Sequence, residues 1–125
     1  MKSYLKVAAV VALLFMLGSI PVRNAHAEDE SERPGAKEQA EVDRANKALD
    51  RVYRDLMSKD PEEQTSLKEA QRAWIKWRDA EANYIARRDA IGGSSRRVAY
   101  SEAELKLINE RIEMLKRYAS QAPED

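Results

Sequence analysis

The chain of 125 residues contains no cysteine and one histidine, His26. Without a thiol it forms no disulfide, has no cysteine nucleophile and offers no cysteine for lipid attachment, so a lipoprotein is excluded. Imidazole is the usual general base in nucleophilic catalysis and a common ligand of zinc, copper and haem iron. We therefore predict no catalytic residue, no metal site and no cofactor, and the protein is not expected to be an enzyme.

The sequence also lacks an apolar run long enough to cross a membrane. Its longest run, Val7 to Ile20, has about 14 residues, whereas a spanning helix needs roughly 20. Lys2 and Lys6 precede the run, and Ala25-His26-Ala27 supplies small residues for a cleavage site. This order is typical of a secretory signal peptide. We predict a signal over residues 1–27 and a periplasmic or secreted mature protein, the alternative being an uncleaved anchor.

No excess of basic residues remains after cleavage. The predicted signal has three basic residues and no acid, which leaves 19 basic and 22 acidic residues and a net charge of −3. A nucleic-acid partner is therefore not expected, whereas a basic protein partner is compatible with this charge. Residues 28–36 are acidic and contain Pro34-Gly35, so they are predicted to be a disordered tail. Residues 121–125 are predicted to be a frayed polar end.

Residues 37–120 are predicted to form one all-α domain. Apolar residues recur at steps of three and four in three segments, 37–57, 61–91 and 94–118, and this spacing is typical of amphipathic helices. Asp60 is expected to cap the second helix. Three such helices with short connections fold into a small antiparallel three-helix bundle with a long central helix. The second segment is the longest, so we expect it to be the central helix.

The second and third helices are expected to form a hairpin about Gly92-Gly93. Counted outward from these glycines, Ala82 and Ala103 are equidistant and should lie near each other. The third helix is expected to begin at Ser94 or Ser95, with Ser101 as an alternative start because Ser101 and Glu104 fit a capping box. An anion-binding turn at Gly92–Ser95 is a second interpretation of the glycines and serines.

Three residues near the middle of the second helix are candidates for a special role. Trp74 lies on the apolar stripe and is predicted to be in the core. Trp77 is interpreted either as an edge of the core or as a half-exposed anchor for a partner. Arg78 interrupts the stripe and is expected to form a buried ion pair, the alternative being a ligand or partner contact. Its expected partners on the other two helices are Asp50, Glu102 and Glu110.

The segment around these residues resembles the LprI-like family, which is named for a lysozyme inhibitor. The resemblance extends over residues 45–115 and depends on the Trp-Ile and Arg-Asp pairs followed by two glycines. The matching positions are Leu49, Tyr53, Leu67, Gln71, Trp74, Ile75, Arg78, Asp79, Gly92, Gly93, Ser94, Arg111 and Leu115.

The resemblance also implies that this chain is a cysteine-less member of the family. Family members usually have one cysteine shortly after the Arg-Asp pair and one on the last helix, and these positions correspond to Ala82 and Ala103 here. The resemblance thus implies that the two family cysteines form a disulfide between the second and third helices. A bridge that closes a loop of about 20 residues contributes roughly 3 kcal/mol, which this chain forgoes.

The function implied by the resemblance is that of an exported helical protein that binds another protein, with lysozyme as the expected partner. The acidic balance of the mature chain is compatible with a strongly basic lysozyme of the animal type. The alternative is a structural or chaperone-like envelope adaptor that binds another periplasmic protein through Trp77. After signal cleavage no membrane association is expected, and the sequence does not determine the oligomeric state.

Overall fold

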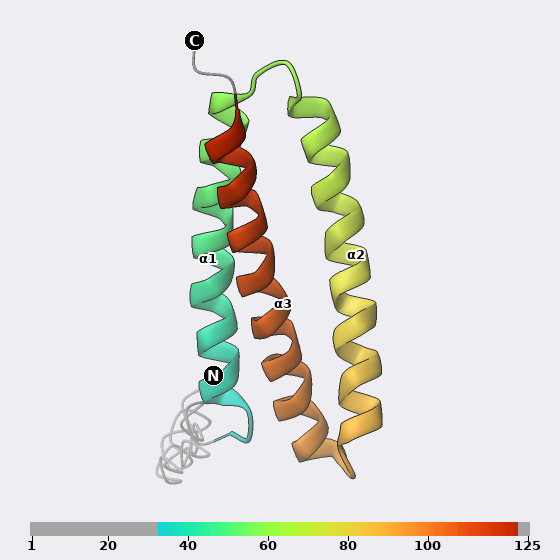
Figure 1. Cartoon of the computed structure of the whole chain (residues 1–125). Coiled ribbons are helices and arrows are strands. Elements are labelled where there is room, and N and C mark those ends of the chain that lie inside the picture. The colour runs from blue at the N-terminus through green and yellow to red at the C-terminus, as the bar shows by residue number, and fades with distance from the viewer. Residues whose placement is uncertain (1–32, 123–125) are drawn as a thin grey trace, which may run out of the picture.

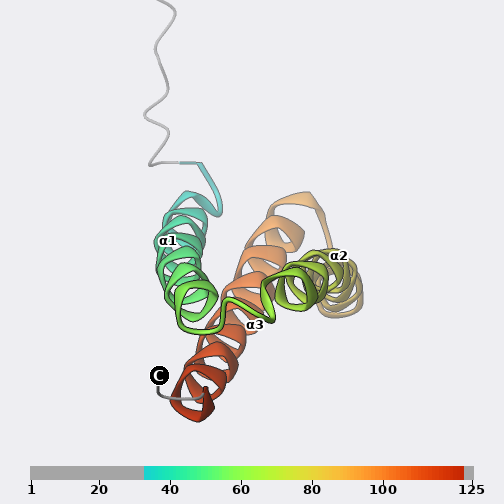
Figure 2. The same ribbon diagram turned by 90° about the horizontal axis from the view of Figure 1, so that it is seen from above.

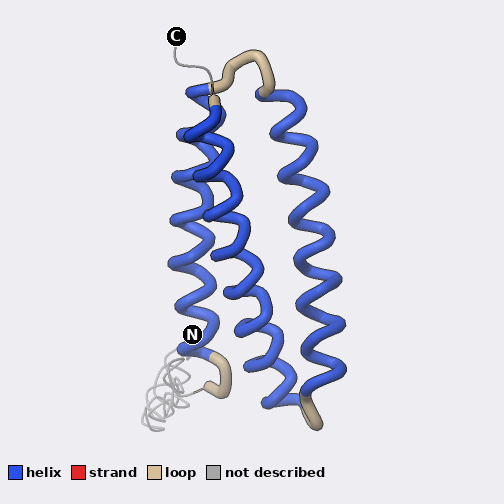
Figure 3. The backbone as a smooth tube through the Cα atoms, in the orientation of Figure 1, coloured by secondary structure: helices blue, strands red, loops and turns tan. Residues whose placement is uncertain are grey.

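The computed structural model describes residues 33–122, and these form three α-helices without a strand. Helix α1 spans Ala36–Lys59, α2 spans Gln64–Asp89 and α3 spans Gly93–Gln121 (Figure 1). Short loops join them, so neighbouring helices run antiparallel (Figure 3). The predicted all-α three-helix bundle is confirmed. The predicted signal over residues 1–27, residues 28–32 of the acidic tail and residues 123–125 lie outside the described residues.

The central helix is α3, and the expectation that the second helix is central was wrong. Helix α3 has 29 residues and α2 has 26. It lies between the other two helices and contacts both, as the view along the bundle shows (Figure 2). The physical reason is that α3 buries residues toward both neighbours, including polar ones, whereas α2 buries only Ala82 and Ala86.

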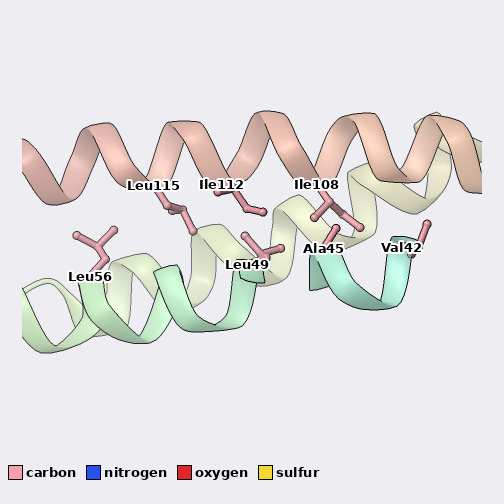
Figure 4. Close-up of a cluster of buried hydrophobic side chains, with 7 residues drawn as sticks. All are labelled: Val42, Ala45, Leu49, Leu56, Ile108, Ile112 and Leu115. Carbon is pink, nitrogen blue, oxygen red and sulfur yellow. The ribbon is translucent and has the colours of Figure 1, made fainter. Parts of the chain in front are cut away.

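The main apolar core lies between α1 and α3. Side chains from the two helices point toward one another in a single layer (Figure 4). The stripes expected on the first and last helices are therefore the faces that meet, and burying them supplies the main driving force for folding. Helix α2 adds the partly buried Leu67 and Trp74 at the edge of this layer. The buried members are Val42, Ala45, Leu49, Leu56, Ile108, Ile112 and Leu115.

A second, smaller core joins α2 to α3. Ala82, Ala103 and Leu107 are buried together, with Ile85 and Tyr100 packed against them. The two alanines whose proximity was expected from their equal spacing to the glycine turn therefore share one buried cluster. Because alanine has only a methyl side chain, the two helix backbones approach closely at this point.

The helix ends differ from the expected ones at two loops. Asp60 does not cap α2. Its N–H donates to the Leu56 carbonyl at the end of α1, and Glu63 is the N-cap of α2. At the second loop α3 begins at Gly93, which agrees with the earlier of the two expected starts. Gly92 precedes it with φ +127°, a backbone region that favours glycine.

The packing of Ala82 against Ala103 yields a test of the hairpin register. We expect the double substitution Ala82→Cys with Ala103→Cys to form a disulfide on oxidation, since both side chains lie in one buried cluster and the chain has no other thiol. Thiol titration and mass spectrometry after oxidation check this. Two free thiols in the folded protein would contradict the register.

Candidate functional site

Two arginines that the sequence singled out, Arg78 and Arg111, converge on the ring of Trp74. The guanidinium carbon of Arg78 lies 5.3 Å from the ring centroid, and that of Arg111 lies 5.7 Å from it. Arg78 is one turn further along α2, while Arg111 comes from α3. Cations within about 6 Å of an aromatic face are attracted by its quadrupole. The tryptophan is thus bound by two arginines from two helices.

Each arginine is further fixed by polar partners. The Nε and Nη2 atoms of Arg78 donate to Oδ1 of Asp79 at 2.8 and 2.7 Å, and Nη2 lies 3.6 Å from Oε1 of Glu104. Its Nη1 donates to Oδ1 of Asn46 at 3.5 Å, so α1 also takes part. The side chains of Arg78 and Glu104 are only 12% and 11% exposed. A charge pair this buried holds its helices in one register, because separating the partners strands a charge.

Arg111 is buried without a carboxylate partner among residues 33–122. Its Nε donates to Oε1 of Gln71 at 3.1 Å, and its Nη1 donates to the thioether Sδ of Met114 at 3.2 Å. Burial lowers the pKa of the Arg111 guanidinium, although arginine remains charged in proteins. The π-face of Trp74 and the amide of Gln71 are therefore the groups that compensate this charge. We name Gln71, Trp74, Arg78, Asp79, Glu104 and Arg111 the Trp74 cluster.

The structure brings five of the singled-out residues into this cluster and leaves the others elsewhere. Ile75 and Trp77 are both exposed on α2 but point to different sides of the helix, and Trp77 is 51% exposed. The structure therefore favours the interpretation of Trp77 as a half-exposed side chain over its interpretation as an edge of the core. Trp74 is partly buried and packs against the main core, as expected. Gly92 is exposed in the loop between α2 and α3, and Gly93 and Ser94 are exposed in the first turn of α3, away from the cluster.

The partners expected for Arg78 were wrong in detail. Asp50 pairs with Arg54 and Glu110 with Lys106, each one turn away on its own helix, and Glu102 is exposed. The ion pair with the third helix exists, but its acid is Glu104. A signal for it was present, since Glu104 lies seven residues before Arg111 and thus on the same face of α3. The adjacent Asp79 is a further partner, because the long Arg78 side chain bends back to it.

Two grooves on the described part of the chain are lined by residues outside the cluster. The larger groove lies at the end of the bundle where α1 begins, α2 ends and α3 begins. Among its lining residues are the basic Arg33, Lys37, Arg96 and Arg97 and a single acid, Asp43. No group of three or more acidic, histidine or cysteine side chains within residues 33–122 has the arrangement of a metal site. The Trp74 cluster thus supports the fold, whereas the exposed surfaces are left for partners.

Loss of Arg78 is expected to destabilise the protein. Arg78→Ala removes a cation from the Trp74 ring and leaves Glu104 buried without its partner, so the free energy of unfolding should fall by about 3 kcal/mol. Urea unfolding followed by circular dichroism measures this. Arg54→Ala is the matched control, because its ion pair with Asp50 is exposed and should contribute under about 1 kcal/mol. Equal effects of the two substitutions would contradict the account.

Glu104 makes stability depend on pH. Burial raises the pKa of the Glu104 carboxyl above its ordinary value. The positive charge of Arg78 lowers this pKa in part, and the negative charge of Asp79 raises it further. The folded chain therefore binds the proton more tightly than the unfolded chain, and Glu104 costs stability as the pH rises through its raised pKa. We expect wild type to gain stability relative to Glu104→Gln as the pH falls from 7 toward 5. Urea unfolding of both proteins across this range checks the sign, and a constant or opposite difference would refute it.

Within residues 33–122 no helix is both long and apolar enough to span a bilayer. A comparison with protein families finds that the model described as lysozyme inhibitor LprI matches residues 24–115, from ahead of α1 to within the last two turns of α3. Searches of curated proteins and of solved structures find no match. The family match includes all of α1 and α2 and every residue of the Trp74 cluster. This chain belongs to the LprI family of lysozyme inhibitors.

Proposed function

We propose that residues 28–125 are exported and that they bind and inhibit a lysozyme outside the cytoplasm. The family match over residues 24–115 is the observation on which this depends. The signal-like residues 1–27 support export, because they combine a basic start, a short apolar run and small residues at the cleavage site. The Trp74 cluster supports an inhibitor rather than an enzyme, since its polar groups are used in holding helices together.

The tip formed by residues 91–97 is the surface that suits this role best. Ile91 is fully exposed, and the backbone turns sharply at Gly92. Arg87, Arg88, Arg96 and Arg97 surround the turn and are all exposed. Lysozymes, like most glycoside hydrolases, act through two carboxylic side chains in a cleft. A narrow basic tip with one apolar residue complements such a cleft in charge and in shape.

The tip gives a direct test of both the function and the surface. Purified residues 28–125 should slow the lysis of a peptidoglycan substrate by an animal-type or a goose-type lysozyme at near-stoichiometric ratio. The double substitution Arg96→Glu with Arg97→Glu should weaken inhibition roughly tenfold, equivalent to about 1.4 kcal/mol. Arg44→Glu with Lys47→Glu, an equal charge change at exposed positions of α1, is the control and should leave inhibition unchanged.

The two parts of this proposal fail separately. If wild type slows neither class of lysozyme, inhibition is refuted. If wild type inhibits and the two double variants weaken inhibition equally, the function stands and the tip is the wrong surface. Circular dichroism of each variant confirms that the helices are intact.

The alternative is a structural or chaperone-like envelope adaptor that binds another periplasmic protein. The observation that favours it is the half-exposed indole of Trp77, because tryptophan is enriched among the residues that dominate protein interfaces. An adaptor of this kind would lose its partner with Trp77→Ala and would leave lysozyme activity unaffected.

A further inference from the structure

Helix α2 has a second apolar face that no other part of residues 33–122 covers. Trp77 and Tyr84 are seven residues apart on this face, and each is more than half exposed; the fully exposed Ile91 follows just beyond the end of the helix. Ala73 and Ala80 are exposed four residues before Trp77 and Tyr84 respectively, at the intermediate positions of the same pattern. A seven-residue apolar repeat with a second apolar position between is the pattern of a helix that packs along another helix.

This outer face is distinct from the face that contacts α3. A helix advances by about 100° per residue. Trp77 is five residues from the fully buried Ala82 and Tyr84 is two residues from it, so both point roughly 140–160° away from the small core. The ribbon seen along the bundle shows α2 at the outside, with α3 on one side only (Figure 2). The face is therefore open to a partner along most of the helix.

The residues of this face are complementary to the same face turned end for end. If two copies of α2 lie antiparallel about a two-fold axis between Arg78 and Asp79, Trp77 of one copy falls opposite Ala80 of the other. Tyr84 then falls opposite Ala73 of the second copy by the same count. Each large aromatic side chain thus meets a small one, which is the arrangement that packs two helices without voids. In a parallel pair each tryptophan would instead meet its own copy.

Charges at the edge of the face favour the same register. Glu69 and Arg87 are 18 residues apart, which is five complete helical turns, so they lie on the same side of α2. In the antiparallel pair equal edges meet, and Glu69 of one copy falls within one residue of the level of Arg87 of the other. Both side chains are exposed, and neither forms an ion pair with another residue of the described chain. Because of the two-fold symmetry, the Glu69–Arg87 pair occurs twice in the dimer.

We propose that the protein forms a two-fold symmetric dimer in which α2 packs antiparallel against α2 of a second copy. The overlap, residues 68–89 of each chain, is about 22 residues or roughly 33 Å of helix. The contact is isologous, because the same residues serve both copies. It depends only on the outer face of α2, so it does not require the proposed binding of lysozyme.

Exchanging the charges of Glu69 and Arg87 tests the proposal, because both side chains are exposed and their substitution does not affect the core. The mass of residues 28–125, which contain all three helices, is measured by sedimentation equilibrium from 1 to 100 μM. We expect a dimer in this range. Glu69→Arg and Arg87→Glu should each weaken it roughly tenfold by placing like charges together, and the two combined should restore affinity to within about threefold of wild type. Arg72→Glu, the same charge change on α2 away from this face, is the control.

The measured masses of the wild type and the variants decide whether this dimer forms. A monomer at 100 μM would overturn the dimer. A dimer that the single charge changes leave intact, or that the combined variant weakens further, would overturn this register. A dimer lost equally in Arg72→Glu would show that net charge, and not the Glu69–Arg87 contact, determines association. Ala80→Trp gives an independent check, since it fills the space opposite Trp77 and should abolish the dimer while circular dichroism remains unchanged.

Discussion

Two arginines bind one tryptophan at the contact between α2 and α3, and the attachment of α2 depends on them. Helix α1 brings Val42, Leu49 and Leu56 into the main core, whereas the only buried residues of α2 are Ala82 and Ala86. Burying a methyl group yields far less free energy than burying a leucine side chain. The remaining stabilisation of α2 comes from Trp74, its two cation contacts and the polar partners that fix them.

Because the chain has no cysteine, the attachment of α2 depends even more on the contacts of Trp74 with the two arginines. No disulfide can form in this chain, and Ala82 and Ala103 form part of the small core between α2 and α3. Close packing of two alanines keeps the helices near each other, but it does not constrain the unfolded chain as a disulfide does. The Trp74 cluster, which lies further along the same helix pair, is then the specific link that remains between α2 and α3.

The sequence predicts the fold class, the three helices and the hairpin register well because apolar spacing determines which helix faces meet. It failed on the central helix, since the expected length of the second segment favoured that segment. The property that makes α3 central is burial on two sides, and it includes polar residues such as Ser101, Glu104 and Arg111 that an apolar pattern does not reveal. The partner of Arg78 was missed for a related reason. Asp50 and Glu110 are satisfied by neighbours on their own helices, so only the three-dimensional arrangement identifies Glu104 as the acid within reach.

The Trp74 cluster is separate from the exposed surfaces that we propose as binding surfaces. The cluster sets the position of α2, and α2 in turn presents the outer face with Trp77 and the basic tip at its C-terminal end. Native-state hydrogen exchange of Arg111→Met tests this dependence most directly, because methionine keeps the apolar stem and removes the cation together with its hydrogen bonds to Gln71 and Met114. The account predicts that amides of α2 lose at least tenfold protection relative to amides at the centres of α1 and α3. Unchanged protection of α2, or an equal loss in all three helices, would contradict it.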